Sequence, residues 1–114
     1  MELRIKTWLL DIHTSIEEIE SFLPEKKDFF SFQSDLKTRK AVERNIEIIG
    51  EAVNRILKQD NSITITNAKR IVGTRNRLAH EYDSISVEII WTIVTKELPS
   101  LKEEVNMLLK HIIS

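Results

Sequence analysis

The sequence predicts an all-α protein that folds as an antiparallel bundle of about four to five helices. Glycine and proline occur only twice each in 114 residues, well below the roughly 7% and 5% of average composition. Apolar residues recur at steps of three and four along most of the chain, which is the period of a helix with one buried face. At this length we expect residues 1–114 to form one domain with a single core.

The first helix is expected over Leu3–Leu23, and Pro24 ends it because proline lacks a backbone donor and restrains the residue before it. Its stripe consists of Ile5, Trp8, Leu9, Ile12, Ile16, Ile19, Phe22 and Leu23. Residues 25–34 hold three phenylalanines without clear helical spacing, at Phe29, Phe30 and Phe32. We expect this stretch to be a loop whose aromatic rings tuck against the core.

A second long helix is expected from about Ser34 to Lys58. Its apolar face consists of Leu36, Val42, Ile46, Ile49, Val53, Ile56 and Leu57. The polar residues 59–62 are turn-prone, and residues 63–65 alternate as a short extended piece.

Thr66 or Asn67 can cap a third helix that ends near Ala79, because their short side chains accept hydrogen bonds from free amides. The capping signal returns ahead of a fourth helix over Val87–Glu97, at Asp83, Ser84 and Ser86. Pro99 suits the first turn of a final helix. The stripe of that helix is Leu101, Val105, Leu108 and Ile112.

Composition narrows the function classes. The absence of cysteine excludes disulfides, zinc knuckles and thiol nucleophiles. Since Gly50 and Gly73 are the only glycines, a glycine-rich phosphate loop is excluded too. No stretch is apolar enough for a secretory signal or a bilayer span, so we expect a cytoplasmic protein that needs no cofactor.

Charge is uneven along a chain whose net charge is −1. Residues 37–77 hold ten Lys and Arg against four Asp and Glu, a balance of +6, and the remaining residues carry −7. Such a basic middle can hold a phosphate backbone, and Arg77, Arg39 and Lys40 are the candidate residues that would bind it. The alternative is that these side chains only solvate the outer faces of two helices.

Chemistry-bearing side chains gather in residues 75–82, which read Arg-Asn-Arg-Leu-Ala-His-Glu-Tyr. An imidazole such as that of His80 titrates near neutral pH and can move a proton, and a guanidinium such as that of Arg75 binds a phosphate through two hydrogen bonds. The other histidines, His13 and His111, have no partners at metal-ligand spacing.

Helix geometry places Asn76 and His80 nearly on one face, whereas Arg75 and His80 are five residues apart and diverge by roughly 140°. One copy therefore makes a poor compact site, and a two-fold axis that brings two such helices together favours an active homodimer. The alternative is that Arg75 pairs with an acid such as Glu47 or Glu51, and that His80 merely ends a capped helix.

The pattern Arg75-x4-His80-x-Tyr82 resembles the signature of the HEPN superfamily, in the form carried by HepT-like toxins of HEPN/MNT toxin–antitoxin pairs. The likeness extends over essentially the whole chain. Residues 35–42 and 48–52 resemble the family's second helix, and Trp91 together with residues 98–101 resembles its carboxyl-terminal part.

The resemblance implies a metal-independent endoribonuclease that acts as a toxin of a type VII-like pair and whose site forms across a homodimer. Arg75 and His80 take the family's catalytic positions, and Asn76 takes the polar position after the arginine. RNA, either transfer or messenger, would be cut to a 2′,3′-cyclic phosphate, which DNA cannot form because it lacks the 2′-hydroxyl. Tyr82 corresponds to the tyrosine that a partner MNT nucleotidyltransferase adenylylates.

Two other functions are compatible with the sequence. The protein could be a non-catalytic helical subunit that binds a nucleotide or a nucleotidyltransferase and presents Tyr82 for modification. It could also be a structural dimerisation module, in which Arg75 and His80 serve as ion-pair and capping residues.

Overall fold

The apolar stripes form helices that pack around one core, as the computed structural model shows for residues 3–25, 28–80 and 86–113. The elements in chain order are α1 (Leu3–Phe22), α2 (Phe29–Ser34), α3 (Leu36–Gln59), α4 (Ala68–His80), α5 (Val87–Thr92), the π-helical turn η2 (Ile93–Glu97) and α6 (Leu98–Ile113). The predicted all-α, antiparallel helical bundle is confirmed. Within the described residues, no helix is both long enough and apolar enough to cross a membrane.

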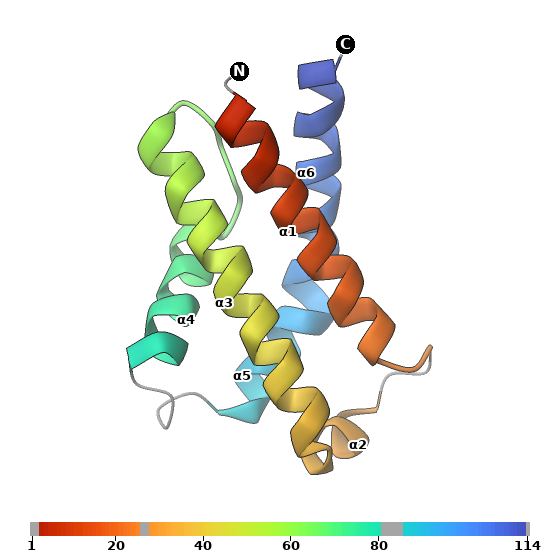
Figure 1. Cartoon of the computed structure of the whole chain (residues 1–114). Coiled ribbons are helices and arrows are strands. Elements are labelled where there is room, and N and C mark those ends of the chain that lie inside the picture. The colour runs from red at the N-terminus through yellow and green to blue at the C-terminus, as the bar shows by residue number, and fades with distance from the viewer. Residues whose placement is uncertain (1–2, 26–27, 81–85, 114) are drawn as a thin grey trace.

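Helix α3 is the centre of the bundle, because it packs against α1 on one side and α4 on the other. Figure 1 shows that α3 runs antiparallel to both neighbours and that α6 lies alongside α1. The core between these helices is almost entirely aliphatic, and its fully buried members include Leu9, Ile12, Ile49, Ile56 and Val105. All five belong to the predicted stripes. Leu36, which the sequence assigns to the apolar face of α3, is instead 57% exposed.

The expectation of a loop over residues 25–34 is wrong, because residues 29–34 form α2. The Asp28 carboxylate starts this helix by accepting hydrogen bonds from the Ser31 backbone N–H at 3.3 Å and from its hydroxyl at 2.7 Å. Phe32 is buried as expected, whereas Phe30 is 74% exposed. A carboxylate cap therefore outweighs the irregular apolar spacing of this segment.

Helix α4 begins at Ala68, immediately after the two residues predicted to cap it. Asn67 adopts a left-handed backbone conformation, with φ of 64°. Thr66 instead anchors the preceding loop to α6, since its backbone N–H and its hydroxyl both donate to Glu104 Oε2, at 3.1 and 2.9 Å.

The predicted helix over Val87–Glu97 is interrupted after Thr92, where the backbone widens into the π turn η2. Ser86 caps α5 as predicted by accepting from the Ile89 N–H at 3.3 Å, whereas Asp83 and Ser84 lie outside the described residues. Pro99 falls in the first turn of α6, as expected.

Candidate active site

Helix α4 carries most of the residues that the sequence singled out. Arg75, Asn76 and Arg77 lie in its carboxyl-terminal half, and His80 is its last residue. Tyr82 lies outside the described residues. These positions therefore follow one helix to its end, and that helix packs against α3.

The Arg75 guanidinium is held from two sides. Its Nη2 lies 2.6 Å from Glu51 Oε2, and its Nη1 donates to Asn76 Oδ1 at 2.8 Å. The sequence offered Glu47 and Glu51 as possible ion-pair partners of Arg75. The structure shows that the partner is Glu51. Since the Arg75 side chain remains 28% exposed, and a guanidinium has further N–H donors, the group can still reach a ligand in solvent.

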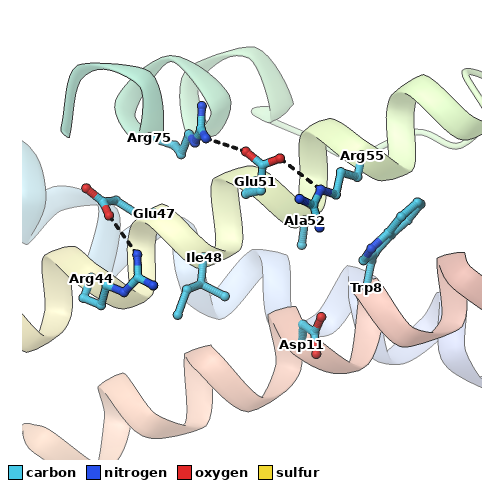
Figure 2. A pocket seen from close by; sticks show the side chains of 9 residues that line it. All are labelled: Trp8, Asp11, Arg44, Glu47, Ile48, Glu51, Ala52, Arg55 and Arg75. Carbon is cyan, nitrogen blue, oxygen red and sulfur yellow. Dashed lines mark hydrogen bonds and ion pairs between the residues drawn. The ribbon is translucent and has the colours of Figure 1, made fainter. Parts of the chain in front are cut away.

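Glu51 is shared between two arginines on the same surface, as Figure 2 shows. Its second carboxylate oxygen accepts from Arg55 Nε at 3.0 Å, one turn further along α3. Glu47, the other candidate, pairs instead with Arg44, whose Nη1 lies 3.2 Å from Oε2. One carboxylate thus fixes the position of Arg75 relative to α3.

Gly50 allows α4 to approach α3 closely at this point. A Cβ atom built on Gly50 would clash with Arg75 Cβ, and would lie 2.9 Å from Arg75 Cγ and 3.1 Å from the Ile71 carbonyl oxygen. The sequence reasoning did not assign Gly50 this role, although an isolated glycine within a helical stripe is a signal of close packing.

An open groove of about 230 Å³ lies beside Arg75, where α1 faces α3. Figure 2 shows the side chains around it. They are Trp8, Asp11, Arg44, Glu47, Ile48, Glu51, Ala52, Arg55 and Arg75. Three guanidiniums face three carboxylates here, so the formal charges of the lining balance. Sequence reasoning missed Trp8 and Asp11 as possible site residues, because in the sequence they belong to an ordinary amphipathic helix.

The structure does not bring Arg39 and Lys40 to this groove. They lie near the start of α3 and do not line the groove, although Lys40 is only about one helical turn before the lining residue Arg44. Arg39 Nη1 donates to the Gln33 carbonyl at 3.1 Å, and Lys40 is exposed. Arg77 is half-buried on α4, two residues beyond Arg75.

Among the described residues, no three His, Cys, Asp or Glu side chains gather closely enough to hold a metal ion. The chemistry that the described groove offers is that of guanidiniums, carboxylates and one indole. Such a set can bind a phosphate and hydrogen-bond to a polar ligand.

Comparison with known proteins gives one consistent family. The sequence model of the family described as "Ribonuclease HepT-like" matches residues 12–108. A protein of Methanocaldococcus jannaschii named "Putative RNase" is 36% identical over 95% of this chain and 89% of its own length.

Two further relatives carry similar names. A "Probable ribonuclease HepT" of Thermococcus cleftensis is 37% identical over 92% of this chain and 96% of its own length. A "Putative RNase" of Caldanaerobacter subterraneus subsp. tengcongensis is 35% identical over 83% of this chain and 88% of its own length. No solved structure shows a significant match.

Proposed function

Because the chain belongs to the HepT-like ribonuclease family, we propose that it is a metal-independent endoribonuclease whose site forms across a homodimer. The observation that carries the proposal is the state of Arg75. Its guanidinium is oriented by Glu51 and Asn76, yet it stays partly exposed at the edge of an open groove. A structural arginine that is sealed between helices would not be accessible to a phosphate.

The proposed reaction uses the ribose next to the cut bond as the nucleophile. His80 of one copy takes the proton of the 2′-hydroxyl, and the O2′ atom attacks the phosphorus. Arg75 stabilises the extra negative charge of the phosphorane through its remaining N–H donors. The bond from phosphorus to O5′ then breaks, and His80 of the other copy donates the proton that the O5′ leaving group takes. The products are a 2′,3′-cyclic phosphate and a 5′-hydroxyl end.

The homodimer is part of this proposal because α4 contains both Arg75 and His80, five residues apart. Positions five apart on a helix diverge by roughly 140°, so one copy does not readily direct both groups at one phosphate. Two copies related by a two-fold axis supply two imidazoles and two guanidiniums to one cleft.

Longer RNA would contact more of the basic middle of the chain. In this proposal Arg77 adds a positive charge next to the cut site. The exposed Lys40 and the neighbouring Arg39 bind the phosphate backbone further along α3.

The proposal extends to control of the toxin by a cognate antitoxin. An MNT-type nucleotidyltransferase would adenylylate Tyr82, two residues beyond His80 in the sequence. The added phosphate charge and bulk would then repel RNA from the site. Incubation with the partner enzyme and ATP should raise the intact mass by adenylate, and Tyr82→Phe should abolish this increase.

The central test is cleavage of total RNA by purified protein and two variants. Arg75→Ala and His80→Ala should abolish cleavage and growth arrest, while light scattering still detects a folded dimer. His13→Ala is the matched control, because His13 contacts Glu17 on α1 and does not line the groove beside Arg75. Unchanged cleavage by the His80→Ala protein would contradict the mechanism. A dimeric wild-type protein that is inert on all RNA would favour the non-catalytic partner subunit instead.

A further inference from the structure

We propose that the groove beside Arg75 is a subsite for one base of the single-stranded RNA, where the base stacks on Trp8 and its edge is read by Asp11. This inference rests on the proposed ribonuclease function, and it adds a determinant of sequence preference to it. RNA that places a phosphate at Arg75 must continue past that residue, and the groove opens directly beside it.

Trp8 has the features of a stacking platform. It is half-buried, with part of the indole packed against the aliphatic core and part lining the groove. In the part of the chain that the structure describes, the contacts between aromatic rings join Phe29, Phe30, Phe32 and Trp91, and none of them involves Trp8. Proteins bind unstacked RNA bases by stacking them on an aromatic ring that is held in place on one side and accessible on the other.

The charges of the groove suit a base better than a chain of phosphates. A phosphate track needs an excess of positive charge, whereas the three guanidiniums of this groove face three carboxylates. Arg44 is paired with Glu47, and Arg55 is paired with Glu51. Asp11 is exposed and makes no ion pair within the described residues, so its oxygens are free to accept hydrogen bonds.

A carboxylate such as that of Asp11 selects among bases by chemistry. Its two oxygens match an edge that presents adjacent N–H donors, and the edge of guanine with its ring N–H and amino group is of this kind. The groove volume of about 230 Å³ lies just below the roughly 300–1,000 Å³ of sites for drug-sized ligands, which fits one base and not several. We therefore expect a preference for guanine in this subsite.

The first test measures binding separately from cutting. The full-length His80→Ala protein is titrated with short single-stranded oligoribonucleotides that it cannot cleave. Adding Trp8→Ala should weaken the affinity by about tenfold, and Trp8→Phe should retain most of it, because a phenyl ring still stacks. Phe30→Ala is the matched control, since it removes an exposed aromatic ring outside the groove and should leave affinity unchanged.

The second test measures base preference with oligonucleotides that differ at single positions. Asp11→Asn should reduce the preference for guanine by about tenfold, because an amide offers one acceptor and adds a donor. Glu103→Gln on α6 removes one exposed carboxylate elsewhere and should change nothing. A melting curve for each variant confirms that it is folded.

Unchanged affinity in Trp8→Ala together with unchanged preference in Asp11→Asn would overturn the subsite. The subsite is also excluded if Trp8 fluorescence, measured in a Trp91→Phe dimer so that Trp8 is the one fluorescent indole, is shielded from acrylamide before RNA is added, because a second copy then covers the groove. If the variants behave as expected but the wild-type protein never cuts the bound RNA, the subsite stands and the ribonuclease proposal fails.

Discussion

Arg75 and Glu51 form an ion pair between α4 and α3, with Nη2 2.6 Å from Oε2. The same carboxylate also accepts from Arg55, so one acid sets the position of two guanidiniums at the edge of the groove. An arginine that is fixed before the substrate arrives loses less conformational entropy on binding a phosphate. A purely structural role for Arg75 would also predict this ion pair. In the proposed reaction the same pair would orient the guanidinium toward the phosphate.

Replacement of Glu51 should separate two effects of this carboxylate, which are the orientation of Arg75 and the electrostatic repulsion of RNA. Glu51→Gln should lower kcat by about 10- to 100-fold, because Arg75 is no longer fixed. The same change removes a negative charge beside two arginines, so KM for RNA should fall. Steady-state kinetics on a short RNA measures both effects, with Glu18→Gln on the exposed side of α1 as the control. Equal losses in kcat and in RNA affinity would mean that Glu51 is needed only for folding.

The two glycines give a matched pair of variants. Gly50→Ala should destabilise the protein by about 1–3 kcal/mol and reduce activity, because its Cβ would force Arg75 and the backbone of α4 away from α3. Gly73→Ala should stabilise it by roughly 0.5–1 kcal/mol, since the new methyl group meets no atom within 4 Å beyond its chain neighbours and the backbone of its own helix, and alanine favours a helix interior. Chemical denaturation compares the two. Similar effects of both changes would refute the close approach at Gly50.

Glu97 is the buried acid of the π turn, with a side chain only 8% exposed, and its partner is Arg70, whose Nε lies 3.2 Å from Oε2. Arg70→Ala should destabilise the protein by about 2 kcal/mol, below the roughly 3–5 kcal/mol of fully buried pairs because Arg70 is half exposed. Adding Glu97→Leu should restore most of this loss, since no buried charge is then left unpaired. Urea unfolding of the single and double variants measures these changes in the free energy of unfolding. If the losses from the two substitutions simply added, the pairing would be contradicted.

Acid should weaken the cap of α3. The Thr38 hydroxyl, 2.6 Å from Asp35 Oδ2, and then the Thr38 N–H hold the pKa of the Asp35 carboxyl below its usual 3.8. Because the pKa of Asp35 is lower in the folded protein than in the unfolded one, the ionised carboxylate stabilises the fold fully above the unfolded-state pKa. This stabilisation is lost as the pH falls through the folded-state pKa.

Asp35→Asn keeps an acceptor for the cap but does not titrate, so its melting temperature should fall less steeply than that of the wild-type protein below about pH 4. Asp28 and Asp60 have pKa values lowered in the same way and titrate in both proteins, so they cancel in the comparison. Parallel melting curves against pH would show that Asp35 does not titrate with folding.

The proposed nucleophile can be tested on the substrate. One 2′-deoxyribose on the 5′ side of the cut bond should reduce cleavage below detection, and deoxyribose at other positions should be tolerated. A chelator should leave the rate unchanged, because the proposed reaction uses only His80 and Arg75. Cleavage of the deoxy-substituted bond, or loss of activity with chelator, would require another mechanism.

Local patterns account for most of the fold. The stripes of α1, α3 and α6 and the cap at Ser86 depend on residues within one or two turns of each other, so the sequence predicts them. The predictions that differ from the structure concern features that the spacing of apolar residues does not encode. The Asp28 carboxylate turns a phenylalanine-rich segment into α2, and the π turn at Ile93–Glu97 widens a helix that has an ordinary pattern.

The sequence by itself determined that the chain is helical, and that Arg75, Asn76 and His80 share one helix in a pattern that resembles a ribonuclease family. It did not decide between Glu47 and Glu51, because residues four apart lie on the same face of α3. The packing of α4 against α3 at Gly50 places Arg75 on Glu51, and the packing of α1 against α3 brings Trp8 and Asp11 to the same groove. Which side chains meet across helices depends on where each helix crosses its neighbour, and only the tertiary structure determines that.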